Sequence, residues 1–245
     1  LRSEYYDARE KVRNLGISIP DGLASRVGSV VGWPAKAVRA LADLSQYDGL
    51  DAGDADTLGL VPMARRAGLD VTVQQAVTSA YKHGCAFLAS YVGRDGLPRV
   101  MCRSALMSSA IWDLEEQEPA CAMTITRVDQ ASHAVTGVML FLPGRIVQVS
   151  ADGGVWSATS TPQAYAGVAV TPVVSDPQLD KPLGRSMITR PLMGYTAAAV
   201  RTLVRMEASA EFYSVPQLLF LGLDPDALDA GEWTTLISRI NGVSK

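Results

Sequence analysis

The most regular hydrophobic pattern in the chain lies between residues 188 and 213. Apolar side chains recur there at steps of three and four residues, which indicates one continuous face on a helix of about seven turns. This apolar stripe consists of Ile188, Leu192, Tyr195, Ala199, Leu203, Met206, Ala210 and Tyr213. Pro191 fits only within a first helical turn, so the helix is expected to begin near Thr189 and to end before Pro216. A short strand at 218–223 and a small helix at 233–240 are expected beyond it.

Three shorter helices are expected before residue 85. The first helix is expected to have Ser3 as its N-cap and to stop at Gly16. The second opens at Trp33, and a third is expected from an N-cap at Asp70 to Gly84. The apolar positions at helical spacing in the second segment are Ala37, Val38, Leu41 and Leu44.

The strand signals begin at residue 85. Residues 85–92 and 99–103 flank an Arg-Asp-Gly turn and are expected to form a β-hairpin. The segment 120–174 is rich in β-branched residues and leaves no room for a long helix. Three prolines between 171 and 184 predict an extended, stiff connector. Helices and strands in this order predict an α+β fold.

Composition narrows the class of protein. The chain has 245 residues, 19% of them charged, and a formal net charge of −3. Ordinary globular chains carry about 25% charged residues, so either the core is large or partners cover part of the surface. The three cysteines are far apart and odd in number, which favours a reducing compartment. The best apolar run, Val135–Leu142, is far shorter than the ~20 residues of a membrane-spanning helix, so no membrane partner is expected. The chain is expected to be a piece of a longer protein.

The histidines and cysteines offer little support for catalysis. His83 is expected in the last turn of a helix, where the dipole favours an imidazolium. Cys85 follows two residues later, but it opens an apolar strand and is expected to be inert packing. His133 is expected in a hairpin turn, and the pair Glu115-Glu116 on an exposed loop. Phosphate-binding loops, CxxC pairs and a nucleophile elbow are absent from the sequence, so no catalytic residue, cofactor or metal site is expected.

Charged residues of the long helix form the remaining candidate site. Arg201 and Arg205 share a face, and Glu207 and Glu211 form a matching acidic pair. The alternative is a solvated helix back with alternating charge. Elsewhere the basic residues are isolated, which argues against an ordinary nucleic-acid-binding face.

Several segments, in the same order along the chain, resemble those of one family. They are EYYD at 4–7, LGISIP at 15–20, VGWPAKAV at 31–38, YKHGCAF at 81–87, PLGRS at 182–186 leading into 201–213, Pro216-Gln217 and Leu221-Gly222. In these segments the chain resembles the portal proteins of tailed bacteriophages, in the branch found in phages and prophages of actinobacteria. Two positions depart from the family pattern: Ala8 stands where relatives commonly have glycine, and Pro191 interrupts a segment that is unbroken helix in relatives.

The resemblance implies a fold in three parts. It predicts an α+β wing domain over 1–183, a long stem helix over 184–214 and a small α/β clip domain, here partial, over 215–245. A second stem helix and a crown, which portals also contain, are absent from this chain.

The resemblance also implies a function without catalysis. A portal is a ring, usually of twelve subunits, at one capsid vertex, and double-stranded DNA is packaged and ejected through its channel. The implied partners are other copies in a dodecameric ring, DNA bound without sequence specificity, the terminase large subunit, a head-tail adaptor, and capsid or scaffold proteins. The implied location is the virion, after assembly in the cytoplasm of the bacterial host. A slightly acidic chain suits sliding DNA, because each cation on a phosphate adds affinity.

The long helix is expected to serve assembly. Its stripe would pack between neighbouring stems or against the second stem helix, with the charged side chains facing the channel or the adjacent subunit. The residues chosen for these roles are Ile188, Leu192, Tyr195, Leu203, Met206 and Tyr213 for packing, and Arg201, Arg205, Glu207 and Glu211 for the charged face. Two alternatives remain open: another ring-forming head-tail connector component, and a hydrolase that uses Cys85 and His83.

Overall fold

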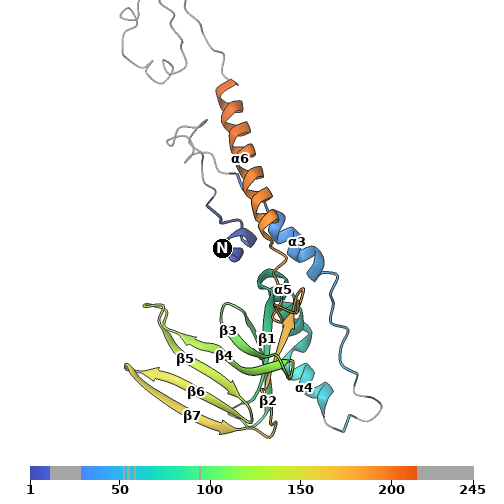
Figure 1. Cartoon of the computed structure of the whole chain (residues 1–245), viewed down its shortest axis with the longest axis vertical. Coiled ribbons are helices and arrows are strands. Elements are labelled where there is room, and N and C mark those ends of the chain that lie inside the picture. Colours follow the sequence, from blue (N-terminus) through green and yellow to red (C-terminus); the bar gives the residue numbers. More distant parts are fainter. Residues whose placement is uncertain (12–28, 52, 54–55, 58, 94, 214–245) are drawn as a thin grey trace, which may run out of the picture. The chain divides into compact units, whose positions relative to one another are not determined.

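The computed structural model describes residues 1–11, 29–51, 53, 56–57, 59–93 and 95–213 (Figure 1). The chain divides into two compact units, Leu1–Glu10 with Gly32–Gly194 and Lys11–Val31 with Tyr195–Lys245. The helices of the described residues are α1 (Arg2–Tyr6), α3 (Trp33–Ala42), α4 (Leu60–Ala67), α5 (Leu69–His83) and α6 (Arg190–Tyr213). The strands are β1 (Cys85–Val92), β2 (Pro98–Ser104), β3 (Ser108–Asp113), β4 (Glu118–Val128), β5 (Val135–Leu142), β6 (Arg145–Asp152), β7 (Val155–Pro162) and β8 (Val170–Val174). The predicted α+β class is confirmed.

The smaller sheet has three antiparallel strands in the order β2-β1-β8. β1 and β2 form the predicted hairpin in continuous register. β8 pairs with the other side of β1, and its Pro172 lies opposite Phe87. Residues 171–174, which the sequence assigned to both the strand-rich segment and the extended connector, form an edge strand. An edge tolerates proline, since the missing N–H can face away from the partner strand.

The larger sheet is a five-stranded meander, with β3 to β7 in sequence order. Its strands confirm the prediction for the β-branched middle of the chain, but β3 was not predicted. β3 pairs with β4 through a register shift between Ile111 and Trp112. Ser108 Oγ donates to Thr124 Oγ1 at 2.6 Å between these strands, and both residues are buried.

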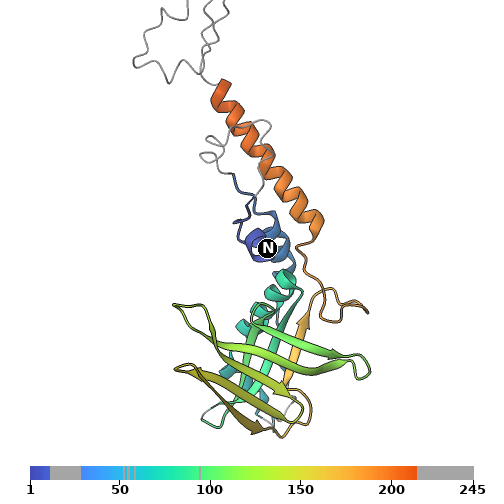
Figure 2. The same cartoon turned by 60° about the vertical axis from the view of Figure 1, so that its left-hand side comes forward.

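The core lies between the two sheets. Its buried residues are Cys85, Phe87, Ala89, Ala122, Met139, Phe141, Ile146, Val168 and Val170. Figures 1 and 2 show the five-stranded sheet on one side of the three-stranded sheet and α5 on its other side. Successive residues of a strand point to opposite faces, so β1 serves both layers: Phe87 enters the core, and the fully buried Ala86 faces α5.

Helices α3 and α5 occur where they were expected, but their ends differ in detail. Asp70 was predicted as the N-cap of α5; instead Gly68 occupies the cap, and Asp70 lies in the first turn, where a carboxylate still favours the positive end of the helix. α3 begins at Trp33 as predicted and buries Val38. The prediction that Leu44 belongs to the apolar face of α3 is wrong, because Leu44 lies beyond the helix and is 84% exposed.

The first helix is shorter than expected. α1 contains Ser3 rather than being capped by it. Ala8 follows with φ of 51°, in the left-handed region that residues other than glycine rarely adopt. The predicted stop at Gly16 lies outside the described residues.

The long helix is confirmed as α6, of 24 residues, and it begins one residue after the expected Thr189. The strand at 218–223, the helix at 233–240 and the clip domain lie outside the described residues. The boundaries predicted for the wing domain (1–183) and the stem helix (184–214) stay predictions.

Candidate functional site

The segment that leads into α6 is fixed to the C-terminal end of α5. The last carbonyl groups of a helix have no partner within it and need donors from elsewhere. In α5, the Tyr81 carbonyl accepts the Met187 N–H at 2.9 Å, and the Lys82 carbonyl accepts the Ser186 hydroxyl at 2.6 Å. The same hydroxyl oxygen accepts the Ile188 N–H at 3.0 Å. Ser186 thus joins the end of α5 to the segment that leads into α6.

A second set of backbone contacts holds this crossing from the side of β8. Ser175 donates its N–H to the Gly84 carbonyl at 2.9 Å, and its own carbonyl accepts the Arg185 N–H at 2.8 Å. Gly184 lies against these groups with φ of 73°, and a Cβ added there would overlap the Ser175 carbonyl oxygen. We call residues 81–84, 175 and 184–188 the helix junction.

The helix junction brings together two of the segments on which the family resemblance rests. Residues 81–84 belong to the YKHGCAF segment, and residues 184–186 end the PLGRS segment. About a hundred positions separate them in sequence, and only the fold shows that they meet. Sequence reasoning missed this site. The signal that could have found it is a glycine in each segment: Gly84 directly follows α5, and Gly184 precedes α6.

The chemistry at the junction does not favour a nucleophile. His83 is half-buried, and burial first, then the charges of Lys82 and Arg2, lowers its pKa. The imidazolium predicted for this helix end is therefore disfavoured. Arg2, rather than His83, supplies the positive charge at this helix terminus, because its Nη1 donates to the His83 carbonyl at 3.0 Å. Burial raises the pKa of the Cys85 thiol, whereas a catalytic cysteine requires the opposite shift.

The other reactive side chains are dispersed. His133 lies in the exposed turn between β4 and β5, and Glu115 and Glu116 lie in an exposed turn after β3, as predicted. Within the described ranges, no three His, Cys, Asp or Glu side chains are grouped so that they could hold a metal ion. The described helices include none that is both long and apolar enough to cross a bilayer.

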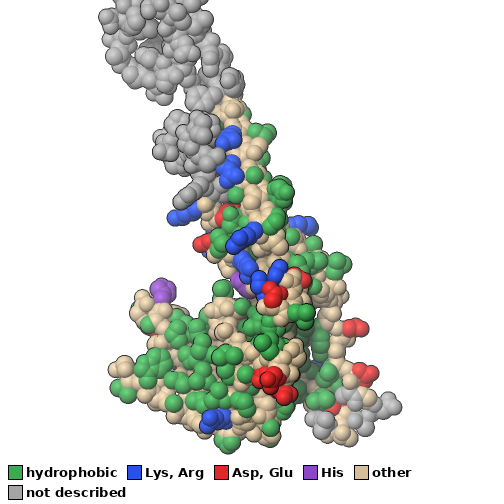
Figure 3. Space-filling view, viewed as in Figure 1, with side chains coloured by type: hydrophobic (Ala, Val, Ile, Leu, Met, Phe, Trp, Pro, Cys, Tyr) green, Lys and Arg blue, Asp and Glu red, His purple; other side chains and the backbone are tan. Residues whose placement is uncertain are grey.

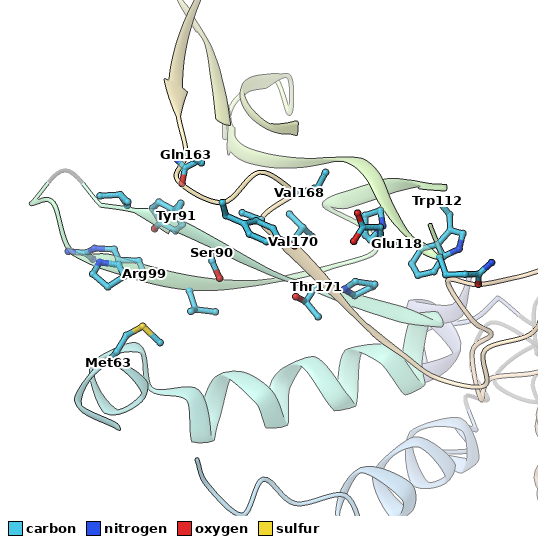
Figure 4. A pocket seen from close by; sticks show the side chains of 18 residues that line it. Met63, Ser90, Tyr91, Arg99, Trp112, Glu118, Gln163, Val168, Val170 and Thr171 are labelled. Carbon is cyan, nitrogen blue, oxygen red and sulfur yellow. The ribbon is translucent and has the colours of Figure 1, made fainter. Parts of the chain in front are cut away.

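A groove of about 680 Å³ lies along β1, β8 and the β3–β4 turn (Figure 4). Aromatic residues from three parts of the chain line it: Tyr91, Trp112 and Tyr165. Its charged residues, Arg99 and Glu118, lie at opposite ends of the view in Figure 4. Neither histidine nor cysteine is among the described residues that line it. The groove therefore offers apolar surface without a pair of groups for acid–base chemistry.

The apolar stripe of α6 is largely accessible in a single chain. Tyr195 is 69% exposed, Met206 62% and Leu203 38%. Leu192 is half-buried, and Ile188 precedes the helix and is 1% exposed within the helix junction. The side chain of Tyr213 lies outside the described residues. The packing partner predicted for the stripe stays a prediction.

The charged residues predicted as a site on α6 differ in their exposure. Arg205 and Glu207 are exposed, and Arg201 is partly buried. The side chain of Glu211 lies outside the described residues. Whether these residues face a channel or a neighbouring subunit also stays a prediction.

Two curated proteins match nearly the whole chain. The portal protein of Mycobacterium phage D29 is 27% identical over 241 residues, which cover 93% of this chain and 49% of the relative. The portal protein of Mycobacterium phage L5 is 26% identical over 237 residues, which cover 92% of this chain and 48% of the relative. The resemblance to phage portal proteins is confirmed. The chain spans about half the length of these relatives, and no protein-family model matches it.

Proposed function

We propose that the chain is part of a subunit of a phage portal, the head-tail connector at one vertex of the capsid. Identical subunits, twelve in the usual case, form a ring whose channel carries double-stranded DNA into and out of the capsid. The similarity to two portal proteins along 92–93% of the chain carries this proposal. The partners are further copies, DNA without sequence specificity, the terminase large subunit, a head-tail adaptor, and capsid or scaffold proteins. The protein assembles in the host cytoplasm and resides in the virion.

The chemistry of the described residues supports a conduit rather than an enzyme. The raised pKa of Cys85 and the lowered pKa of His83 oppose the only nucleophilic pair that the sequence suggests. The net charge of −3 limits attraction to phosphate, so DNA can move along the surface instead of binding tightly.

The long helix supplies the stem of this proposed ring. The exposed Tyr195 and Met206 support packing of the apolar stripe against a neighbouring stem or the second stem helix. Arg201, Arg205, Glu207 and Glu211 then face the channel or the adjacent subunit. Residues 1–183 form the wing domain and 215–245 the beginning of the clip domain.

The test is electron microscopy and native mass spectrometry of the purified full-length protein. The expected result is a closed ring with a central channel, which binds the purified terminase large subunit. A protein that stays monomeric at every concentration would contradict the proposal, and a ring that does not bind terminase would favour another connector component.

A matched pair of variants tests the role of the stripe. Met206→Asp places a charge on the stripe and is expected to abolish ring formation, because an unpaired carboxylate is costly to bury. Ala198→Asp places the same charge at an exposed position of α6, about 80° around the helix from Met206, and is expected to leave the ring intact. Equal effects of the two substitutions would refute the packing role.

A further inference from the structure

The two sheets of the described residues end in four edge strands: β2 and β8 in the smaller sheet, β3 and β7 in the larger. An edge strand exposes unpaired backbone N–H and C=O groups, which can pair with any extended chain. Proteins block such pairing with charged residues, proline, bulges or short strands. An edge that lacks all of these devices is therefore informative.

Three of these edges have at least one such blocking feature. β2 carries Arg99 and Arg103 and begins at Pro98. β8 has five residues with Pro172 at its centre. β3 contains a register shift and ends at Asp113. Each edge thus has at least one feature that hinders the addition of another strand.

β7 has such a feature only at its last residue, Pro162. All eight of its residues are exposed, and no charged residue occurs from Gly153 to Gln163. Its pairing with β6 is unbroken along the whole strand, and its one proline, Pro162, is the last residue. Val155 and Trp156 are 73% and 55% exposed. β7 is a neutral, eight-residue edge without a bulge, and Figure 1 shows it at the free end of the meander.

The outer face of the five-stranded sheet continues the apolar surface of β7. Trp156 and Ala158 lie opposite Ala151 and Val149 of β6, on the face of the sheet that points away from the core. In Figure 3 hydrophobic side chains cover most of the sheet surface turned to the viewer. Five strands of about eight residues present a face of roughly 600 Å², close to the ~800 Å² that one partner contributes to a specific interface.

We propose that β7 pairs with an extended segment of a neighbouring copy of this chain, so that the sheet continues across a subunit boundary and the neighbour covers Trp156. A second copy is the occupant that fits best, because neutral and apolar surfaces are typical of permanent homo-oligomeric interfaces. A closed ring needs two different contact surfaces on each subunit, and β7 supplies one of them. The inference rests on the proposed function, since the ring provides the neighbour.

Photo-cross-linking in the full-length protein tests this pairing. A benzoylphenylalanine at Thr159, in the middle of β7, is expected to give a species of twice the subunit mass on a denaturing gel, with linked peptides from two chains. The same group at Thr171, an exposed position on β8 of the smaller sheet, is expected to give no such species. Cross-links within one chain only, or only to a different protein, would overturn the proposal.

A pair of charge substitutions gives a second readout. Thr159→Lys is expected to lower the fraction of protein in rings at least tenfold, while Thr171→Lys on β8 leaves it unchanged. Rings that persist in Thr159→Lys, with no cross-link at position 159, would overturn the β7 proposal and leave the portal function standing. A wild-type protein that forms no ring, yet cross-links between two chains at Thr159, would overturn the portal function and leave the β7 pairing standing.

Discussion

Replacement of Gly184 by alanine is expected to be among the most damaging small changes in the chain. The residue adopts φ of 73°, and its missing side chain leaves room for the Ser175 carbonyl, which accepts the Arg185 N–H at 2.8 Å. A methyl group there overlaps that carbonyl oxygen and also approaches the Gly84 carbonyl oxygen to 2.9 Å. The backbone of the helix junction must move to accept it.

The cost has two parts. Alanine in the left-handed region costs about 1–2 kcal/mol, partly offset by about 0.4–1 kcal/mol because the unfolded chain loses freedom. Displacement of the buried Ser175 carbonyl leaves a polar group unsatisfied, which costs about 1–3 kcal/mol. Gly184→Ala should therefore lower the free energy of unfolding by about 2–4 kcal/mol.

Gly96→Ala is the matched control. Gly96 has φ of 77°, nearly the same as Gly184, but nothing lies within 4 Å of an added Cβ. The control therefore carries the backbone strain without the overlap, and should cost about 1 kcal/mol or less. Urea unfolding followed by tryptophan fluorescence measures both values. Equal losses in the two variants would refute the claim that close packing at the helix junction requires glycine.

Three further predictions concern other parts of the chain. Ala8→Gly should raise the free energy of unfolding by about 1 kcal/mol in urea unfolding, because alanine is strained at φ of 51°; no gain would contradict this. The lowered pKa of His83 means that the fold favours the neutral imidazole, so its contribution to stability is present above about pH 6.5 and is lost as the pH falls through the depressed pKa. Unfolding curves at about pH 7.5 and pH 5 should therefore differ more in wild type than in His83→Gln, and equal differences would refute it. Phe141→Ala should cost about 3–5 kcal/mol because the ring is fully buried, against about 0.5 kcal/mol or less for Ile111→Ala, which is 66% exposed; similar thermal shifts would contradict the core assignment.

Long and strongly patterned elements could be predicted from the sequence. The stripe of α6 repeats over many residues, and Pro191 confines the start of the helix, so the expected start differs from Arg190 by one residue. The β1–β2 hairpin follows from two β-rich segments around a short turn. α4 and β3 were missed, because elements of eight and six residues contain too few periods for a pattern to emerge.

Helix ends were predicted less well than helix interiors. Ser3 and Asp70 were assigned as caps by residue type, but Leu1 and Gly68 occupy the cap positions, and neither helix has a side-chain capping hydrogen bond. Asp56 does bond to the first turn of a helix, although the sequence did not predict that helix. Its carboxylate oxygens accept the Leu60 and Val61 N–H groups at 2.7 and 2.8 Å, at the start of α4.

The helix junction lay beyond sequence reasoning for a different physical reason. Its hydrogen bonds join residues about a hundred positions apart, such as Ser186 and Lys82, and no local pattern encodes which carbonyl meets which donor. Most of its contacts use backbone atoms, and Gly84 and Gly184 contribute by having no side chain. A strand of the five-stranded sheet can exchange one apolar residue for another, whereas these positions have no substitute.

The helix junction also bears on assembly. The junction fixes the start of α6 through the backbone, with Ser186 as its main side-chain contact, and therefore leaves little rotamer freedom there. A ring closes only when every subunit repeats the same geometry. If the long helix is a stem, small differences in its first turn would add up around the ring. We therefore expect Gly184→Ala to reduce ring closure even where the subunit still folds, while Gly96→Ala leaves closure unchanged; intact rings in both variants would separate the junction from assembly.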